Sequence, residues 1–233
     1  MFPKVIVMTG IDGSGKTTQA QLLVNYFRQK GISVGFTQQF NSETVLGKLI
    51  LKKVGHGLIK LERSVSNESY FNSNNLKHES LLKTALKFFA EIRIILMGLY
   101  RTWVKILKNR KMSLLIFDRY FYDDVNKAKW MYNLSNQIEK LAIIFVPKSA
   151  FVFYLDVPAE IARDREIDGD TTLEQHIKKK EIYDEWFDNI YKNHKNVYKI
   201  CTDKEAYQNH IEIINILKNE TGLGDSSEDR ICN

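Results

Sequence analysis

Short, almost wholly apolar segments recur along this chain between longer stretches whose apolar positions follow a helical period. The segments with strand character, rich in β-branched and aromatic residues, are 5–9, 33–37, 114–118, 151–156 and 197–201. The first, third and fourth are apolar at nearly every position, which is typical of strands covered on both faces. Helical periods extend over residues 15–30, 43–53, 77–109, 134–145, 158–165, 172–193 and 204–219. This alternation predicts βαβ units, and therefore an α/β fold in which helices flank a central parallel sheet of about five strands.

The segment 77–109 is apolar over more than one helical face. Its helically spaced apolar residues are Leu81, Leu82, Ala85, Leu86, Phe89, Ile92, Leu96 and Leu99, and the apolar surface is widened by Phe88, Ile95, Trp103 and Leu107. A helix that is apolar most of the way round is buried in its own domain or covered by a partner. Two compatible arrangements stay open here: a central core helix and a homodimer interface.

The chain shows no internal division. No repeat of solenoid length is visible, and no linker rich in Gly, Ser or Pro interrupts the sequence. We therefore expect a single domain over residues 1–221. Residues 222–233 are polar and rich in Gly, Ser and Asp, which predicts a flexible tail.

Composition and charge exclude some classes of protein. The chain has 233 residues, 44% of them hydrophobic, which is enough for one sizeable core and too apolar for wholesale disorder. The 34 Lys and Arg residues outnumber the 28 Asp and Glu residues, so the formal net charge is +6. An excess of positive charge suits a polyanionic partner such as a nucleotide, a nucleic acid or an anionic lipid. Because the charge is scattered and no known nucleic-acid-binding module is present, we expect no nucleic-acid partner.

Cysteine usage and the apolar runs indicate the compartment. Cys201 and Cys232 cannot build a disulfide framework, and their spacing matches no zinc motif. Residues 1–7 lack the basic stretch, long apolar run and cleavage site of a signal peptide. The longest clean apolar run around the segment 81–107 covers only residues 94–100, far too few to span a bilayer. We expect a cytoplasmic protein with reduced cysteines and no membrane partner.

The most specific motif follows the first predicted strand directly. Residues 10–17, Gly-Ile-Asp-Gly-Ser-Gly-Lys-Thr, match the pattern G-x-x-x-x-G-K-[ST] at every fixed position. The glycines let successive backbone N–H groups point into one concavity that holds phosphate oxygens, and the positive N-terminus of the following helix adds to it. Lys16 would neutralise charge on the β- and γ-phosphates, and the Thr17 hydroxyl would ligate Mg²⁺. The motif predicts a three-layer P-loop NTPase fold with a nucleotide-phosphate site formed by Gly10, Asp12, Gly13, Ser14, Gly15, Lys16, Thr17 and Thr18.

A loop of this kind occurs in kinases, GTPases, motors and ATPases alike. A switch GTPase would also need a base-reading Asn-Lys-x-Asp, which the sequence lacks. Asp12 lies inside the loop, beside the expected γ-phosphate, where a carboxylate repels phosphate unless it contacts a neutral group such as a substrate hydroxyl. The loop therefore predicts a second ligand facing the nucleotide. The alternative is an Asp12 side chain turned to solvent.

Beyond the loop, the sequence resembles the thymidylate kinase family of nucleoside monophosphate kinases over about residues 4–190. The motifs that carry the resemblance are Gly-Ile-Asp-Gly-Ser-Gly-Lys-Thr-Thr-Gln at 10–19, Phe-Ala-Glu-Ile-Arg at 89–93, Ile-Phe-Asp-Arg-Tyr at 116–120, Phe-Tyr-Leu-Asp-Val-Pro-Ala-Glu at 153–160, Arg163, and Glu174 with Tyr183 nine residues later. The later motifs are short, and their order after a phosphate loop is what makes them informative. The resemblance implies transfer of the γ-phosphoryl group of ATP to a phosphate-bearing small acceptor, with dTMP, converted to dTDP, as the leading candidate.

The resemblance also implies roles for residues outside the loop. Arg93 and Arg119 would hold the acceptor phosphate, Phe89 would stack on its base, and Tyr120 would complete the acceptor site with Asp12. Asp118 would lie near Mg²⁺ together with Thr17. Some family members carry an arginine in the loop where this chain has Gly13. The arginines that stabilise the transferring phosphoryl group, alongside Lys16 and Asp12, would therefore be Arg163 and Arg165 in a lid over about residues 163–173.

Structural alternatives stay open for these residues. Arg93 would instead pair with Glu91 or Glu79 inside an apolar helix. Arg163 and Arg165 would form a solvated face beside acidic neighbours in the lid, and Asp118 and Arg119 would pair with each other. Asp156, which precedes Pro158, is predicted to be a helix-capping residue and not a catalytic one.

The chain departs from the family pattern on the acceptor side. Residues 37–40 are Thr-Gln-Gln-Phe where the family has Thr-Arg-Glu-Pro, and Lys127 lies near the place of a tyrosine that helps to discriminate deoxyribose. The lid is short and acidic, and residues 54–78 have no clear family counterpart. Two other hypotheses therefore stay open. One is a P-loop kinase of another nucleotide, a nucleoside or a sugar metabolite, and the other is a non-catalytic nucleotide-binding module that docks a partner.

Overall fold

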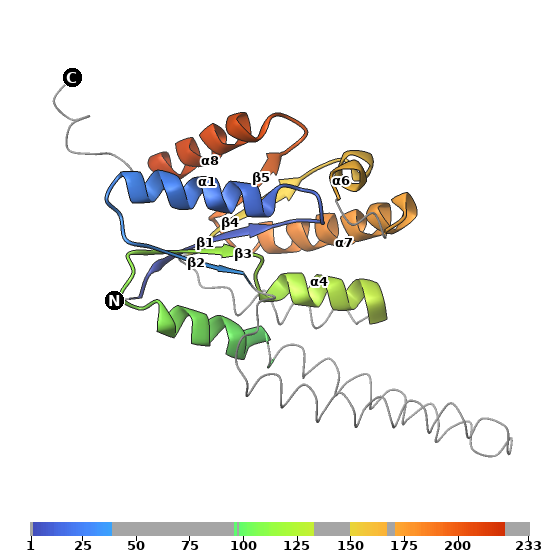
Figure 1. Cartoon of the computed structure of the whole chain (residues 1–233). Helices are drawn as coiled ribbons and strands as arrows, with labels where there is room; N and C mark the ends of the chain where they lie inside the picture. The colour runs from blue at the N-terminus through green and yellow to red at the C-terminus, as the bar shows by residue number, and fades with distance from the viewer. Residues whose placement is uncertain (1, 39–95, 97, 133–149, 167–170, 222–233) are drawn as a thin grey trace, which may run out of the picture.

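The computed structural model of the chain describes residues 2–38, 96, 98–132, 150–166 and 171–221 (Figure 1). Its labelled elements are, in order, β1 (Lys4–Thr9), α1 (Lys16–Gln29), β2 (Val34–Gln38), β3 (Leu114–Asp118), α4 (Phe121–Tyr132), β4 (Phe151–Asp156), α6 (Ala159–Arg165), α7 (Leu173–Tyr191), β5 (Val197–Cys201) and α8 (Ala206–Thr221). Residues 98–108 are also helical. Among the described helices, none is long and apolar enough to cross a membrane.

The described strands form one parallel sheet in the order β2-β3-β1-β4-β5. In the register, Met8 and Gln38 both lie beside Asp118, so the carboxyl ends of β1, β2 and β3 meet at one edge. The order of the strands reverses at β1, and in open α/β sheets ligands bind outside the carboxyl ends of the strands at such a reversal. The topology therefore places the candidate site beyond Thr9 and Asp118.

Helices cover both faces of the sheet, which makes three layers (Figure 1). On β1, Ile6 and Met8 face the layer of α1 and α8, whereas Val5 and Val7 face the layer of α4 and α7. The first layer contributes Leu23, Phe27, Ile213 and Leu217, and the second contributes Tyr122, Val125, Trp186 and Ile190. Both faces of the inner strands are therefore buried, which explains why these strands lack the alternation of polar and apolar residues.

The predicted architecture is confirmed. The five strands are present with ends that differ by at most one residue from the predictions, and helices are present in 15–30, 158–165, 172–193 and 204–219. The predicted helices 43–53 and 134–145, the tail 222–233 and the segment 54–78 lie outside the described residues. Of 77–109, residues 96 and 98–108 are described; there Ile106 is buried while Trp103 and Leu107 are exposed. The homodimer stays a prediction.

The sequence analysis missed α4. The aromatic residues Tyr120, Phe121 and Tyr122 come soon after β3, and the sequence analysis assigned no helical period to them. The helix starts there because a carboxylate supplies the cap: Asp123 Oδ2 accepts a hydrogen bond from the Tyr120 N–H, and the Asp123 N–H donates to the Tyr120 carbonyl. Acidic side chains in the first turn also complement the helix dipole.

Candidate active site at the carboxyl edge of the sheet

The loop between β1 and α1 is shaped by its glycines. A Cβ atom on Gly10 would lie 2.7 Å from the Leu155 carbonyl oxygen, and one on Gly13 would lie 2.1 Å from the Ala162 carbonyl oxygen. At Gly13 this contact is with the backbone of α6, so no side chain, and hence no loop arginine, fits at this position. Gly15 meets nothing within 4 Å, but its φ of +88° is in the left-handed region that favours glycine. It is the N-cap residue of α1.

Lys16, the first residue of α1, folds back into the loop. Its side chain is only 4% exposed, and its ammonium group donates hydrogen bonds to the Ile11 carbonyl and to Ser14 Oγ. Burial, and then repulsion from Arg119, lower the pKa of Lys16 to about 8, against attraction from Asp12, Asp123 and Asp118. An anion in the loop concavity would favour the charged ammonium, so this lysine is suited to bind phosphate oxygens.

Thr17 and Asp118 lie together where the loop meets β3. The Thr17 hydroxyl donates to Asp118 Oδ2 at 2.7 Å, and Gln38 Nε2 donates to the same oxygen at 2.9 Å. Asp118 is 2% exposed, and its other oxygen, Oδ1, has no hydrogen-bond partner among the described residues. A hydroxyl and a carboxylate with a free buried oxygen, beside a phosphate loop, are the hard oxygen donors that Mg²⁺ prefers. The residues present therefore fit a magnesium ion held by Thr17 and Asp118.

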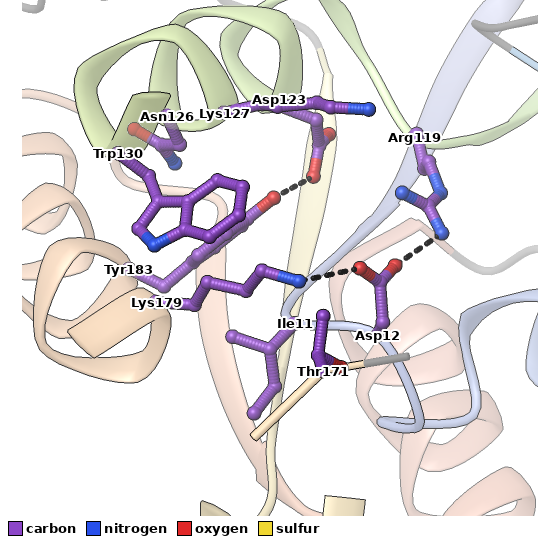
Figure 2. Close-up of a pocket in the computed structure, with 10 residues that line it drawn as sticks. All are labelled: Ile11, Asp12, Arg119, Asp123, Asn126, Lys127, Trp130, Thr171, Lys179 and Tyr183. Carbon is purple, nitrogen blue, oxygen red and sulfur yellow. Dashed lines mark hydrogen bonds and ion pairs between the residues drawn. The ribbon is translucent and has the colours of Figure 1, made fainter. Parts of the chain in front are cut away.

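Asp12 is held by two cations and not by a neutral group. Arg119 Nη2 lies 2.6 Å from Asp12 Oδ1, and Lys179 Nζ lies 3.3 Å from Asp12 Oδ2 (Figure 2). Burial acts to raise the pKa of Asp12, but attraction from Lys16 and Arg119 outweighs it, and the pKa lies well below its ordinary value. Asp12 is thus a carboxylate at neutral pH whose charge is compensated by its neighbours. This is how the loop tolerates an acid beside the expected phosphate.

Arg119 owes its position to an unusual backbone conformation. Its φ is +71°, the one positive φ among the described residues other than glycine, and its N–H donates to the Met8 carbonyl at 3.0 Å. The chain therefore turns sharply between β3 and α4, and the guanidinium reaches back to the loop. The predicted alternative of an Asp118–Arg119 pair is wrong, because Arg119 pairs with Asp12 and Asp118 bonds to Thr17 and Gln38.

A pocket of about 250 Å³ opens beside this ion-pair cluster. Its lining residues come from the loop, the β3–α4 turn, α4, the segment before α7 and α7, and are Ile11, Asp12, Arg119, Asp123, Asn126, Lys127, Trp130, Thr171, Lys179 and Tyr183 (Figure 2). The Lys179 ammonium lies 4.8 Å from the centre of the Trp130 ring as well as beside Asp12. The lining thus combines charged and polar side chains with two aromatic ones, Trp130 and Tyr183.

Asp123 is a buried carboxyl group in the wall of this pocket. Its Oδ1 accepts hydrogen bonds from the Thr9 hydroxyl at 2.8 Å and the Tyr183 hydroxyl at 2.9 Å, while its Oδ2 accepts from the Tyr120 N–H. Burial raises the pKa of Asp123, although these hydrogen bonds act to lower it. The group ties β1, α4 and α7 together, so it fixes the shape of the pocket.

The lid arginines bind groups outside the phosphate loop in this structure. Arg163 pairs with Asp164 at 2.7 Å on the surface, as the structural alternative predicts, and Arg165 donates to the Thr202 carbonyl. Glu166 and Thr171 flank residues 167–170, which the structure does not describe, and the Thr171 hydroxyl donates a hydrogen bond to Glu166 Oε2. The catalytic role of both arginines stays a prediction.

Two expectations need correction. Tyr120, predicted to contact the acceptor, is 1% exposed and packs edge-to-face on Phe117 in the core, where burial raises the pKa of its hydroxyl. Asp156 does not cap α6, whose N-cap is Pro158 without a side-chain hydrogen bond. Instead, Asp156 forms ion pairs with Lys180 and Lys199. Phe89 and Arg93 lie outside the described residues.

Sequence analysis missed most of the pocket. Asp123, Asn126, Lys127 and Trp130 share one face of α4 at helical spacing, and Lys179 and Tyr183 are four residues apart on α7. In the first set the sequence singled out Lys127 alone, through the family pattern, and the shared face became visible only once residues 121–132 were recognised as a helix. In the second set Tyr183 was named only as part of a family motif, without a role in the site. For Lys179 there was no signal, because a lysine on a charged helix does not differ in sequence from a solvated one.

Comparisons with known proteins agree with this geometry. The family model described as thymidylate kinase matches residues 8–213. The thymidylate kinase of Plasmodium falciparum is 30% identical over 184 residues, which cover 78% of this chain and 74% of that protein. The probable thymidylate kinase of Pyrococcus horikoshii is 34% identical over 155 residues, 66% of this chain and 65% of that protein. The crystal structure of thymidylate kinase from Ehrlichia chaffeensis superposes with a TM-score of 0.51 at 20% identity, covering 93% of this chain and 100% of that chain, which shows a shared fold.

Proposed function

The chain belongs to the thymidylate kinase family of phosphotransferases, and we propose that it transfers the γ-phosphoryl group of ATP to dTMP, giving dTDP and ADP. The observation that carries this proposal is the ion-pair cluster of Arg119, Asp12 and Lys179, which joins the phosphate loop to the pocket. A site that transfers phosphoryl groups needs one place for the donor phosphates and an adjoining place for the acceptor. The cluster lies between the two.

On the donor side, the loop binds the ATP phosphates through its backbone N–H groups and Lys16. In the structure, the Lys16 ammonium donates to the Ile11 carbonyl and Ser14 Oγ. Phosphate oxygens are stronger acceptors than these neutral groups, so ATP would draw the ammonium away from them. Thr17 and Asp118 would hold Mg²⁺, which when bound supplies positive charge to the phosphate oxygens.

On the acceptor side, Arg119 orients the phosphate of dTMP. A guanidinium can bind a phosphate through two parallel hydrogen bonds, and Asp12 already holds that of Arg119 in one orientation. Lys179 approaches the same carboxylate from α7 and adds a second positive charge beside the reacting phosphates. Positioning and charge neutralisation of this kind account for most catalysis of phosphoryl transfer, which needs no covalent enzyme intermediate.

The lid supplies the remaining positive charge that stabilises the transferring phosphoryl group. Arg163 and Arg165 are bound at the surface here, and the exchange of Asp164 and the Thr202 carbonyl for phosphate oxygens would bring them to the donor. Because Gly13 packs directly on the backbone of α6 at Ala162, a movement of the lid base is transmitted to the loop. Closure over the substrates would also exclude water, which otherwise competes with dTMP as acceptor.

An assay of ADP release tests the proposal. ATP·Mg²⁺ would be combined in turn with dTMP, dUMP, UMP, CMP, AMP, GMP, thymidine and several sugars, with the Lys16→Ala variant as blank. We expect the highest turnover with dTMP. Turnover with another acceptor alone would keep the phosphoryl-transfer chemistry and overturn the substrate. ATP binding without turnover on any acceptor would overturn the kinase and favour a nucleotide-binding module.

A further inference from the structure

Asp118, at the end of β3, is held by two neutral donors that come from different elements. The Thr17 hydroxyl of α1 donates to its Oδ2 at 2.7 Å, and Gln38 Nε2 of β2 donates to the same oxygen at 2.9 Å. A carboxylate held by one donor can still turn about that bond, whereas two donors from separate elements fix the orientation of the group. The second oxygen, Oδ1, is buried and has no hydrogen-bond partner within the part of the chain that the structure describes. The two donors together therefore decide that Oδ1 is the oxygen left for a ligand.

Gln38 reaches this carboxylate because of the register of the sheet. It is the last residue of β2 and lies directly beside Asp118 in the parallel pairing of β2 with β3, so both side chains leave the sheet on the same face. Although β2 lies at the edge of the described sheet, the Gln38 carbonyl accepts a hydrogen bond from Lys105 of the helical segment 98–108. The backbone of Gln38 is thus held by a helix as well as by β3, which restricts the movement of its side chain.

The two donors also leave the negative charge of Asp118 in place. Asp12, the other carboxylate near the loop, is paired with the cations Arg119 and Lys179. Asp118 instead receives its hydrogen bonds from a hydroxyl and an amide, which orient a carboxylate without neutralising it. A buried carboxylate that has one oxygen fixed and one oxygen open is suited to bind a cation.

We propose that Gln38 is a positioning residue for the magnesium site, an assignment that rests on the proposed function. Its amide holds Asp118 Oδ2 so that Oδ1 is the oxygen offered to Mg²⁺, while Gln38 itself does not contact the ion. Groups that orient a metal ligand in this way contribute about 10- to 100-fold to metal affinity. Gln38 stands where the family pattern has an arginine, so this arrangement belongs to the chain and not to the pattern.

Binding of ADP with and without Mg²⁺ tests this role, because it needs no turnover. Calorimetry would give the Kd for ADP in the presence of a chelator and in the presence of MgCl₂, and the ratio of the two values is the enhancement of binding by the metal. Gln38→Met keeps the length of the side chain and removes the N–H donor. We expect the enhancement to be about 10-fold smaller in this variant than in the unchanged protein, with the same Kd in chelator.

Two further variants exclude a merely structural explanation. Gln29→Met, at the exposed end of α1, is the matched control, and we expect both of its Kd values to equal those of the unchanged protein. Gln38→Asn keeps an amide that is one methylene too short for the contact, so it should behave like Gln38→Met and replaces that variant if it fails to fold. An equal rise of the Kd in chelator and in MgCl₂ would show that Gln38 only stabilises the end of β2, and would overturn the proposal.

A double-mutant cycle with Asp118→Asn tests whether Gln38 acts through that carboxylate. If it does, adding Gln38→Met to a protein that already carries Asp118→Asn should change the enhancement by less than about 2-fold, because the group that it orients is no longer charged. A further loss as large as that of Gln38→Met alone would mean that the two residues act independently, and would overturn the proposal.

The outcomes separate this proposal from the function on which it rests. A lost enhancement in Asp118→Asn with full enhancement in both Gln38 variants would overturn the role of Gln38 and leave the kinase and its metal site intact. Full enhancement in Asp118→Asn would overturn the metal site and this proposal with it. An unchanged protein that binds no ADP would overturn the proposed function itself.

Discussion

The phosphate loop and the pocket beside it meet at Asp12, but the chain builds them in different ways. The loop is one continuous segment, residues 10–18, whose shape comes from glycine backbone and from packing against the carbonyls of Leu155 and Ala162. The pocket is lined by side chains from the loop, α4, the segment before α7 and α7. A site made of backbone is set by local sequence, whereas a site made of side chains on separate helices can be altered one residue at a time.

Charge is also handled differently in the two regions. In the loop, the Lys16 ammonium donates to a carbonyl and a hydroxyl, and burial lowers its pKa. Beside the pocket, Asp12 is matched by Arg119 and Lys179. The loop therefore presents a cation whose hydrogen-bond acceptors are neutral groups. In the cluster, one carboxylate offsets part of the charge of two cations, so a substrate phosphate would have to rearrange their ion pairs. Substitutions in the loop should consequently have larger effects than substitutions in the pocket.

The largest effect is expected for Lys16→Ala. Removing a charge aimed at the transferring phosphoryl group should lower kcat by about 10²–10³-fold, as does the loss of a comparable transition-state contact. Steady-state ADP release measures this, and Lys30→Ala at the exposed end of α1 is the matched control. Equal kcat values for the two variants would mean that Lys16 does not contact the donor.

The second largest effect is expected for Asp118→Asn. The substitution keeps the size of the side chain and removes the charge that would hold Mg²⁺ beside Thr17. We expect the Mg²⁺ concentration needed for half-maximal activity to rise at least about 10-fold, the lower range for disrupted metal sites. Titration of activity with MgCl₂ after treatment with a chelator measures the change. An unchanged Mg²⁺ requirement would remove Asp118 from the metal site.

Lys179→Ala tests whether the ion-pair cluster of Arg119, Asp12 and Lys179 takes part in turnover. We expect kcat/KM for dTMP to fall by about 10- to 30-fold, because one of two cations beside the reacting phosphates is lost. The neighbouring Lys178, which is exposed on the same helix, provides the control Lys178→Ala. Partial recovery in Lys179→Arg would identify the charge as the active feature. Equal values for Lys178→Ala and Lys179→Ala would restrict Lys179 to a structural role.

The pKa of Lys16 predicts a pH dependence that is specific to the loop. Since the group is positive below its pKa of about 8 and neutral above it, the free enzyme should lose affinity for ATP as the pH rises through 8. At pH 9, one unit above the pKa, kcat/KM for ATP should be about 10-fold lower than its plateau. Lys16→Arg, which stays charged, should show no such decline over this range if it retains activity. A pH profile shared by both proteins would assign the ionisation elsewhere.

The smallest effect is expected for Tyr183→Phe in the pocket wall. The change removes one of three hydrogen bonds to Asp123 and leaves those from Thr9 and the Tyr120 N–H. The loss of about 1 kcal/mol should lower Tm by roughly 2–4 °C in a chain of this size, with turnover nearly retained. Differential scanning calorimetry measures the shift. A loss of activity larger than that of Lys179→Ala would show that Tyr183 contacts the substrate.

Much of the fold could be predicted from sequence because its signals are local. The five strands are confirmed to within a residue. The three inner ones, β1, β3 and β4, were recognisable because strands covered on both faces are apolar throughout, as at Ile116 and Phe153. Helix α4 was missed because its first turn is aromatic and packs into the core, and because the cap from Asp123 becomes visible only in three dimensions.

The sequence by itself determined the phosphate loop, the order of strands and helices, and the family to which the chain belongs. These depend on residues that are neighbours along the chain, where spacing implies geometry. Only the tertiary structure decided that Arg119 pairs with Asp12, that Tyr120 is a core residue, and that Asn126 and Lys179 line one pocket. Those relations join helices that are distant in sequence, and their packing on the sheet, together with the left-handed turn at Arg119, brings the side chains to one site.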